Sequence, residues 1–177
     1  MTELAYGDDR HRLLLTAQAF EAACMCLDKV PNAADPTEAF APLNEALWWG
    51  AAFDEGMREL EGETYEQRRD AATDGRAMPG IVFARNRGGH YRALMLRNRY
   101  GTELGSWILG KGQLGLTSRL VWRDRAELPP GRSNYGETAY KRHHEAQPVR
   151  DTMAGARRWI HGGARGEGPL FFPISSS

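Results

Sequence analysis

Cysteine is scarce in this chain of 177 residues, which contains only Cys24 and Cys26. One residue separates them within an apolar pattern of helical spacing, so on a helix their side chains would point about 200° apart. That geometry disfavours an intrachain disulfide, and a zinc site would need further ligands nearby. We predict two buried free thiols, as is usual for proteins of a reducing compartment.

Long apolar runs are missing as well. No stretch approaches the roughly 18 consecutive apolar residues of a membrane-spanning helix. The N-terminal stretch MTELAYGDDRHRLLL has no basic segment followed by an apolar core, which a signal peptide would need. These absences predict a soluble, cytoplasmic protein that does not contact a membrane.

Charge of one sign is not in excess, because 23 Lys and Arg balance 23 Asp and Glu. Any surface that binds nucleic acid must therefore be local. The length suits one domain with a sizeable core, to which we assign residues 1–163. The Gly-, Pro- and Ser-rich residues 164–177 form a tail, which is either disordered or anchored through Phe171 and Phe172.

Apolar periodicity predicts a mainly α-helical chain. Asp35 should cap the second long helix, with Pro36 at its first position. Its segment EALWWGAAF is apolar around most of the circumference, so this helix should cross the middle of a bundle, with Trp48 on its apolar face. Helices are expected over residues 9–29, 36–60, 79–98, 133–146 and 148–160, with a short helix or linker at 62–75.

A β-hairpin is expected near residues 105–123. The β-prone runs Trp107–Leu109 and Leu116–Trp122 flank a Gly-rich turn, and Pro129-Pro130 follow. The turn GKGQLG matches a phosphate-binding GxGxxG pattern, but the residues after it favour a strand, whereas phosphate binding needs a helix N-terminus there. A hairpin turn is therefore favoured, and no cofactor is expected.

His143 and His144 are adjacent near the C-terminal end of the fourth predicted helix. Neighbouring helical side chains point about 100° apart, so the pair cannot easily chelate one metal ion. A solvated polar helix face is the favoured interpretation, with a phosphate contact or a role supporting a site as the alternative. No metal site is expected.

Acidic residues are absent between Asp74 and Glu103, although the chain is neutral as a whole. Cleavage of RNA without a metal needs a base, an acid and a cation that neutralises the phosphorane. Histidine transfers protons near neutral pH and arginine binds phosphate in a bidentate manner, so His90 among arginines suits this chemistry. The arginines of the stretch are Arg76, Arg85, Arg87, Arg92, Arg97 and Arg99.

The hexapeptide RNRGGH, from Arg85 to His90, resembles the motif of the HEPN ribonucleases, in which Arg, a polar residue that is often Asn, and then His lie on a helix of an all-α bundle. The helix EALWW before the motif and the closing helix PVRDTMAGARRWI resemble small actinobacterial HEPN-like proteins. The chain departs from the family at Gly88-Gly89, where aliphatic residues are usual. It departs again at Tyr91, because one toxin branch has its tyrosine two positions after the histidine.

The resemblance implies a HEPN-like helical bundle with an inserted β-hairpin, in which two protomers face their motifs to form one composite site. It implies a metal-independent endoribonuclease that leaves 2′,3′-cyclic phosphate ends and acts in phage defence, a toxin–antitoxin system or a stress response. His90 would be the general base or acid, Arg85 the phosphate clamp and Asn86 an orienting hydrogen-bond group. The expected partners are RNA, a second copy of the chain, and an antitoxin or other partner protein.

Further residues are expected to support this site. Glu45 would orient Arg85 or His90, or else is an exposed helix charge, and Tyr91 is a supporting candidate. Contacts with the RNA backbone are assigned to Arg87, Arg92, Arg97 and Arg99. Two other functions remain open, namely a non-catalytic HEPN-like module that binds RNA or a partner, and a dimeric scaffold whose arginines pair with carboxylates from elsewhere in the chain.

Overall fold

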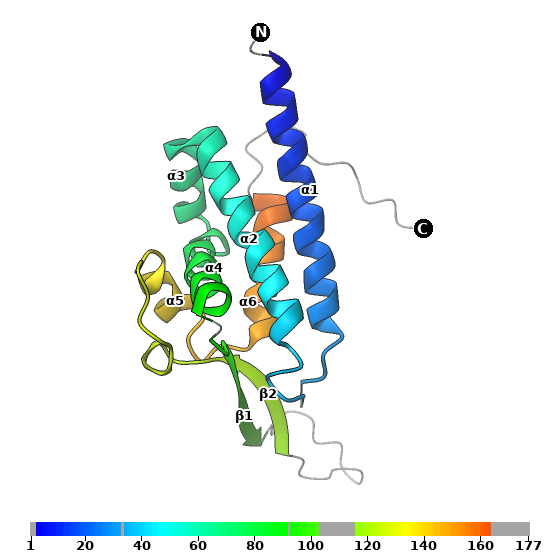
Figure 1. The fold of residues 1–177 in the computed structure, drawn as a ribbon, viewed down its shortest axis with the longest axis vertical. Coiled ribbons are helices and arrows are strands. Elements are labelled where there is room, and N and C mark those ends of the chain that lie inside the picture. Colours follow the sequence, from blue (N-terminus) through cyan, green and yellow to red (C-terminus); the bar gives the residue numbers. More distant parts are fainter. Residues whose placement is uncertain (1–2, 33, 92, 103–115, 164–177) are drawn as a thin grey trace.

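Helices make up most of the structure (Figure 1). The computed structural model describes residues 3–32, 34–91, 93–102 and 116–163. The α-helices of this part are α1 (Glu3–Asp28), α2 (Phe40–Glu61), α3 (Glu63–Ala71), α4 (Met78–Arg85), α5 (Glu137–His143) and α6 (Val149–Arg158). Together with one two-stranded antiparallel sheet, they confirm the predicted mainly α fold with a β-hairpin.

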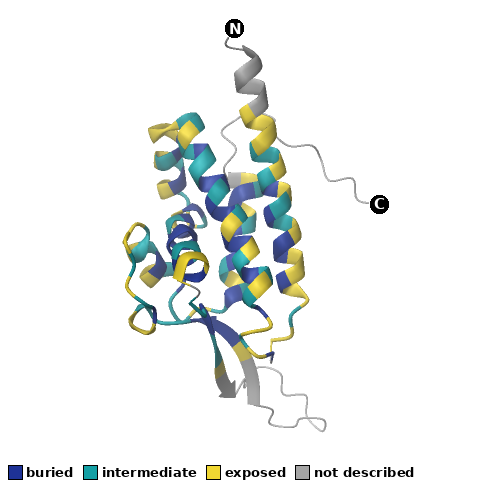
Figure 2. Ribbon diagram, in the orientation of Figure 1, coloured by how far each residue is buried: buried dark blue, intermediate teal, exposed yellow. Residues whose placement is uncertain are grey.

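The helix α2 packs along α1 on one side and against α4 on another, which confirms its predicted place in the middle of the bundle (Figure 1). Gly50 allows a close approach to α1, because a Cβ there would lie 3.1 Å from the Phe20 ring. The buried residues of α1 and α2 turn toward the interior (Figure 2). Trp48 is the exception to the prediction, since 52% of it is exposed. The neighbours of α2 leave this side of the helix uncovered.

The start of α2 differs from the prediction. The helix begins at Phe40, whereas Asp35 caps a turn before it. The Asp35 Oδ1 accepts hydrogen bonds from the Thr37 amide at 2.8 Å and from the Thr37 hydroxyl at 2.6 Å. The polar side chain therefore stabilises the turn by bonding the backbone two residues on.

The cysteine prediction holds for one residue of the two. Both are free thiols, but Cys24 is buried whereas Cys26 is exposed. Burial raises the pKa of the Cys24 thiol to about 12. The same angular separation that prevents their pairing on α1 places one side chain in the core and the other in solvent.

The third predicted helix, from Pro79 to Asn98, is wrong in its second half. The helix α4 ends at Arg85, and Asn86–His90 form a single wider, π-helical turn, η2. The chain then enters strand β1 (Leu96–Thr102). Two consecutive glycines weaken the helix at this point, and strand pairing decides the conformation of the residues beyond it.

Strand β1 pairs antiparallel with β2 (Leu116–Trp122), with Leu96 opposite Trp122. Both of these side chains are buried, so the pairing adds apolar residues to the core. The second predicted strand is confirmed, whereas the first, at residues 107–109, lies outside the described residues. So does the predicted tail, 164–177.

His144 corrects the prediction of a solvated histidine pair. It is fully buried and stacks on Tyr140, with 5.6 Å between ring centroids, and its edge lies against Trp122. Gly80 makes room for it, because a Cβ there would lie 2.6 Å from the imidazole. Burial lowers the pKa of His144 to about 3, with a smaller contribution from His143. The imidazole is therefore a neutral part of the core.

None of the described helices combines the length and the apolar character that a membrane span requires. This finding agrees with the absence of long apolar runs in the sequence.

Candidate functional site

The motif of Arg85 to His90 lies where α4 widens into η2 and approaches α2. Gly88 suits this approach, because a Cβ at residue 88 would lie 2.4 Å from the Asn44 Oδ1 on α2 and would displace that side chain. Gly89 is different, since a Cβ there would have no neighbour within 4 Å. One glycine of the pair therefore fits the turn against the bundle, and the other faces open space.

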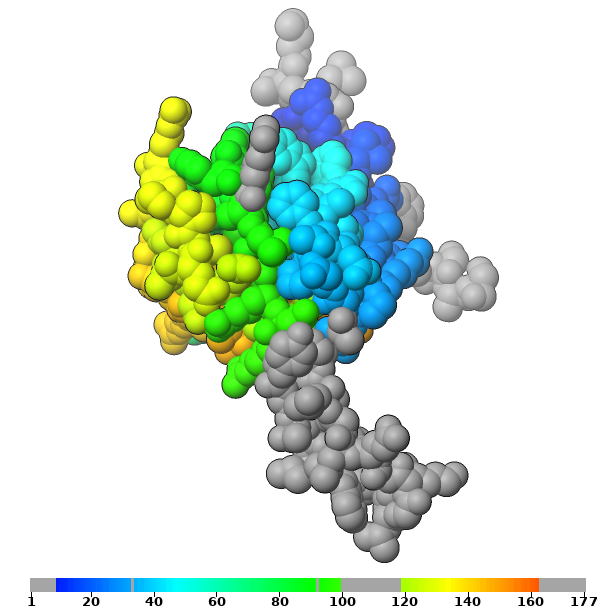
Figure 3. All heavy atoms as spheres, turned by 60° about the horizontal axis from the view of Figure 1, so that its bottom comes forward, coloured from blue at the N-terminus to red at the C-terminus, as the bar shows by residue number. Residues whose placement is uncertain are grey.

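A pocket of about 430 Å³ lies between η2 and the loop of residues 131–134. Its six lining residues include no acid, and they are Asn86, Arg87, His90, Tyr91, Arg132 and Ser133. His90 is exposed and forms no hydrogen bond with the described residues. Figure 3 shows this end of the molecule, where the chain after α4 passes between α2 and the segment of residues 120–140. The pocket thus presents an imidazole and a guanidinium to solvent.

Arg87 is fully buried behind this pocket. Its Nη2 donates to the Ser133 carbonyl at 3.2 Å and to the Asn134 Oδ1 at 3.3 Å. Its guanidinium carbon lies 4.6 Å from the centroid of the Phe83 ring. Gly131 makes room for it, since a Cβ there would lie 1.2 Å from the Arg87 Nη1. Arg87 therefore holds the loop 131–134 against the end of α4.

Tyr91 holds the same loop from the solvent side. Its hydroxyl accepts a hydrogen bond from the Arg132 amide at 2.9 Å. The Arg87 guanidinium carbon lies 5.6 Å from the Tyr91 ring centroid, so the ring also covers the buried cation. Tyr91 therefore helps to position the loop that carries Arg132.

The positive charge of Arg87 has no counter-charge in direct contact among the described residues. No described carboxylate forms an ion pair with it, and its buried Nε lacks a hydrogen-bond partner there. Burial lowers the pKa of Arg87, and repulsion from Arg125 lowers it further. Arg125 lies 5.6 Å from the Phe83 ring centroid and is paired with Glu137 at 3.2 Å. The uncompensated charge is therefore that of Arg87, on the pocket wall.

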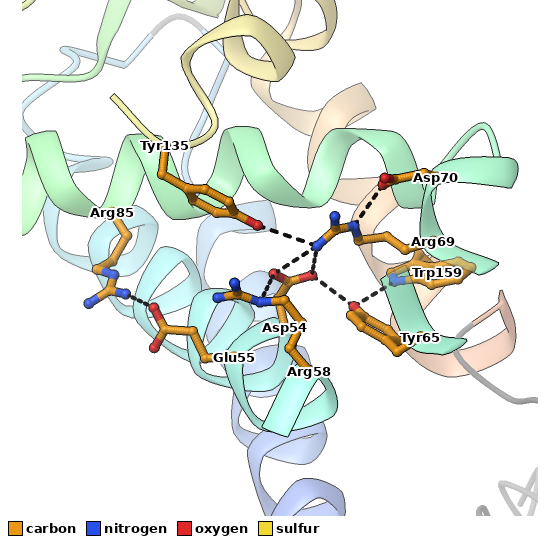
Figure 4. A network of polar contacts seen from close by, with 9 residues as sticks. All are labelled: Asp54, Glu55, Arg58, Tyr65, Arg69, Asp70, Arg85, Tyr135 and Trp159. Atoms are coloured by element: carbon orange, nitrogen blue, oxygen red, sulfur yellow. Dashed lines mark hydrogen bonds and ion pairs between the residues drawn. The ribbon is translucent and has the colours of Figure 1, made fainter. Parts of the chain in front are cut away.

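Arg85 does not line the pocket. Its Nη2 forms an ion pair with Glu55 (Figure 4), and its guanidinium carbon lies 5.4 Å from the centroid of the exposed Trp48 ring. Glu45 is exposed and makes no ion pair or hydrogen bond with the described residues. The packing of α2 on α4 thus selects Glu55, not Glu45, as the carboxylate beside Arg85.

Arg97 and Arg99 of the acid-free stretch are not among the residues that line the pocket. Arg97 is paired with Asp124 and with Glu127, both at 2.8 Å. Arg99 is exposed and lies opposite Arg119 in the β-ladder. Arg92 is outside the described residues. The positive charge of the acid-free stretch is therefore partly neutralised in the folded protein, by acids from α2 and from the segment after β2.

A second polar cluster surrounds Asp54 in the interior (Figure 4). The buried Asp54 carboxylate accepts hydrogen bonds from the Tyr65 hydroxyl at 2.8 Å and from the Arg69 Nη1 at 3.3 Å. The Arg58 Nε lies 3.5 Å from it. The Trp159 Nε1 donates to the Tyr65 oxygen at 3.3 Å, and burial followed by the Asp54 charge raises the pKa of Tyr65. The negative charge of Asp54 is thus paired with the positive charges of Arg58 and Arg69. The cluster joins α2, α3 and the end of α6.

The structure brings together four of the predicted site residues, Asn86, Arg87, His90 and Tyr91. Arg132, Ser133 and Asn44 could not be recognised from the sequence, because the stretch GRSN after Pro130 has only the composition of a turn. Among the described residues, no group of three His, Cys, Asp or Glu side chains could hold a metal ion.

Comparisons of the chain with protein-family models, with curated proteins and with solved structures found no match. The indications of function are therefore the geometry of the pocket and the resemblance of RNRGGH to the HEPN motif.

Proposed function

We propose that the chain is a metal-independent endoribonuclease whose proton-transferring group is His90. One observation carries the proposal: an exposed histidine lines a pocket that contains two arginines and no acid. A phosphodiester is an anion that arginine binds well, and histidine changes its charge near neutral pH. The pocket thus offers the two kinds of group that cleavage of RNA requires.

The reaction would be an internal transfer at phosphorus. His90 of one protomer takes the proton of the 2′-hydroxyl, and the protonated His90 of a second protomer gives one to the leaving 5′-oxygen. The 2′-oxygen bonds to phosphorus as the bond to the 5′-oxygen breaks, and a 2′,3′-cyclic phosphate results. Nearby guanidinium groups stabilise the phosphorane, and Asn86 orients the substrate by hydrogen bonding.

A second copy of the chain would complete the site, as in the family that the motif resembles. Trp48 supports this arrangement, since its ring is half exposed beside Arg85 and offers apolar surface next to the motif. Docking of a second protomer would bring its Arg85 and His90 toward the first pair. Light scattering is expected to give about twice the chain mass of 19.8 kDa.

An RNA-cleavage assay with single variants tests the function. His90→Ala should reduce the rate by about 10² to 10⁴, the usual cost of losing a general acid or base. Cleavage should survive EDTA and leave cyclic phosphate ends, identified by mass spectrometry. His143→Ala is the control, because His143 lies on α5 outside the pocket. Cleavage that persists in His90→Ala, or that EDTA abolishes, would exclude this mechanism.

A second candidate is a module that binds RNA or a partner without cleavage. The ion pair of Arg85 with Glu55 favours it, because a guanidinium that is already neutralised is a weaker phosphate clamp. RNA binding that weakens steeply with salt, without any cleavage, would support this candidate over the enzyme.

A further inference from the structure

Arg132 is the guanidinium of the pocket that solvent can reach. It is exposed, and no carboxylate of the described residues forms an ion pair with it. Its backbone amide is fixed by the Tyr91 hydroxyl at 2.9 Å, whereas its side chain lines the pocket beside His90. A cation held at its backbone and unpaired at its tip is suited to bind a ligand.

The buried Arg87 adds a second, independent indication of an anionic ligand. A guanidinium does not lose its proton in proteins, so burying its charge calls for an acid, hydrogen bonds, aromatic faces or a ligand. The rings of Phe83 and Tyr91 cover the Arg87 guanidinium but carry no counter-charge. Arg87 has hydrogen bonds only at Nη2, and its Nε is buried without a partner among the described residues. An anion in the adjoining pocket would supply the missing counter-charge.

We propose that this pocket binds one phosphoryl group, with Arg132 as its direct ligand and Arg87 as a positioning residue that holds the Arg132 loop. The inference deepens the proposed function, on which it rests for the identity of the substrate as RNA. It assigns the phosphate contact beside His90 to a residue forty-two positions beyond that histidine, and not to Arg85. Arg87 acts on the loop through the Ser133 carbonyl and the Asn134 side chain.

Titration of the full chain with inorganic phosphate tests the direct contact, with the NMR signals of the His90 imidazole as the readout. Phosphate should shift these signals in a saturable manner. Arg132→Ala should weaken binding at least tenfold, as expected for a charge-assisted hydrogen bond. The phosphate affinity of Arg132→Lys should lie between those of the wild type and Arg132→Ala, because lysine keeps the charge but cannot bind in a bidentate manner. Arg142→Ala removes an exposed arginine on α5 and should leave binding unchanged.

The positioning role of Arg87 is tested by a double-mutant cycle. Arg87→Met should weaken phosphate binding. In the double variant, Arg87→Met with Arg132→Ala, the loss of phosphate-binding free energy should be smaller than the sum of the losses in the two single variants. A merely structural residue would lower the thermal midpoint without this coupling. Gly131→Ala is the second variant if Arg87→Met does not fold, since the new Cβ would displace the Arg87 guanidinium. Gly89→Ala, which adds a Cβ in open space, is its control.

Each outcome decides between the proposals. Unchanged binding in Arg132→Ala, or a wild-type His90 signal that phosphate does not move, would overturn the phosphate site. Strictly additive losses in the cycle would overturn the role of Arg87. If wild-type protein binds phosphate through Arg132 but cleaves no RNA, this inference stands and the proposed ribonuclease fails. If Arg132→Ala cleaves RNA at the wild-type rate, the ribonuclease stands and this inference fails.

Discussion

Two clusters of arginines in this molecule differ in how their charge is balanced. Around Asp54, Arg58 and Arg69 approach one buried carboxylate that also accepts the Tyr65 hydroxyl hydrogen bond. At the end of α4, Arg87 and Arg132 line a pocket with no acidic side chain. The first arrangement satisfies its charges within the protein, whereas the second leaves two guanidinium groups without an ion-pair partner among the described residues.

The difference shows how a structural arginine can be told from a ligand-binding one. Placing a guanidinium in the interior is costly unless a partner compensates its charge. Such compensation around Asp54 links three helices and leaves nothing for a ligand. Its absence around Arg87 costs stability, and a site that gives up stability in this way is a candidate for function.

The largest effect on stability is expected from removing the Asp54 charge. Asp54→Asn keeps the shape but leaves the largely buried Arg69, which is 5% exposed, with only the exposed Asp70 carboxylate, 3.0 Å from its Nε, as a counter-charge. We expect the free energy of unfolding, measured by urea denaturation, to fall by about 3 to 5 kcal/mol.

Glu55→Gln is the matched control for that change, since it removes the neighbouring acid from a pair whose carboxylate side chain is 41% exposed. The expected loss is below about 1 kcal/mol. Equal losses in the two variants would mean that the interior cluster is no more stabilising than a surface ion pair.

His144 differs from the buried arginines, because a buried imidazole can lose its proton and stay neutral, whereas a guanidinium cannot. Its folded pKa, about 3, lies below the unfolded value of about 6.5, so only the unfolded chain binds a proton between these values. Stability from this group is complete above pH 6.5. It should fall by about 1.4 kcal/mol per pH unit as the solution is acidified toward pH 3.

The variant His144→Leu should remove this part of the acid sensitivity, measured as the urea midpoint from pH 7 to pH 4. His143→Gln should flatten the profile much less, because the pKa of the half-buried His143 is lowered by weaker burial. An unchanged pH profile in His144→Leu would contradict the assignment of the buried neutral imidazole.

The smallest effect is expected from the two glycines of η2, the turn that lines the pocket. Gly88→Ala should cost about 1 to 3 kcal/mol of unfolding free energy, because its Cβ would overlap the Asn44 side chain. Gly89→Ala has open space and should be neutral or stabilising by up to about 1 kcal/mol. Thermal melts of the two variants measure the difference, and a loss in Gly89→Ala as large as in Gly88→Ala would refute the close-contact explanation.

Much of the secondary structure could be predicted from local signals. Apolar periodicity located α1 and α2, Pro148 marked the start of α6, and β-prone residues located β2. The prediction failed between Arg85 and Leu96. Helical periodicity continued past Gly88-Gly89, but antiparallel pairing with a strand some twenty residues later imposed an extended conformation there.

The candidate site was predictable only in part. A histidine among arginines was visible in the sequence, and so was the resemblance of its motif to a ribonuclease family. The partners of those arginines were not visible, because Glu55, Asp124 and Glu127 lie some thirty residues away from Arg85 and Arg97 along the chain. Sequence spacing describes neighbours on one helix, whereas ion pairs between elements depend on how those elements pack.

The sequence by itself determined that the chain forms helices with a hairpin and that positive charge gathers around His90, because residue type and local periodicity fix both. Only the packing of the elements determines which of those charges have an ion-pair partner. Packing of α2 against α4 neutralised Arg85 with Glu55, and the segment after β2 neutralised Arg97. The fold buried Arg87 beneath the loop that carries Arg132 and left His90 exposed beside it, since burial and charge balance depend on contacts between residues far apart in the chain.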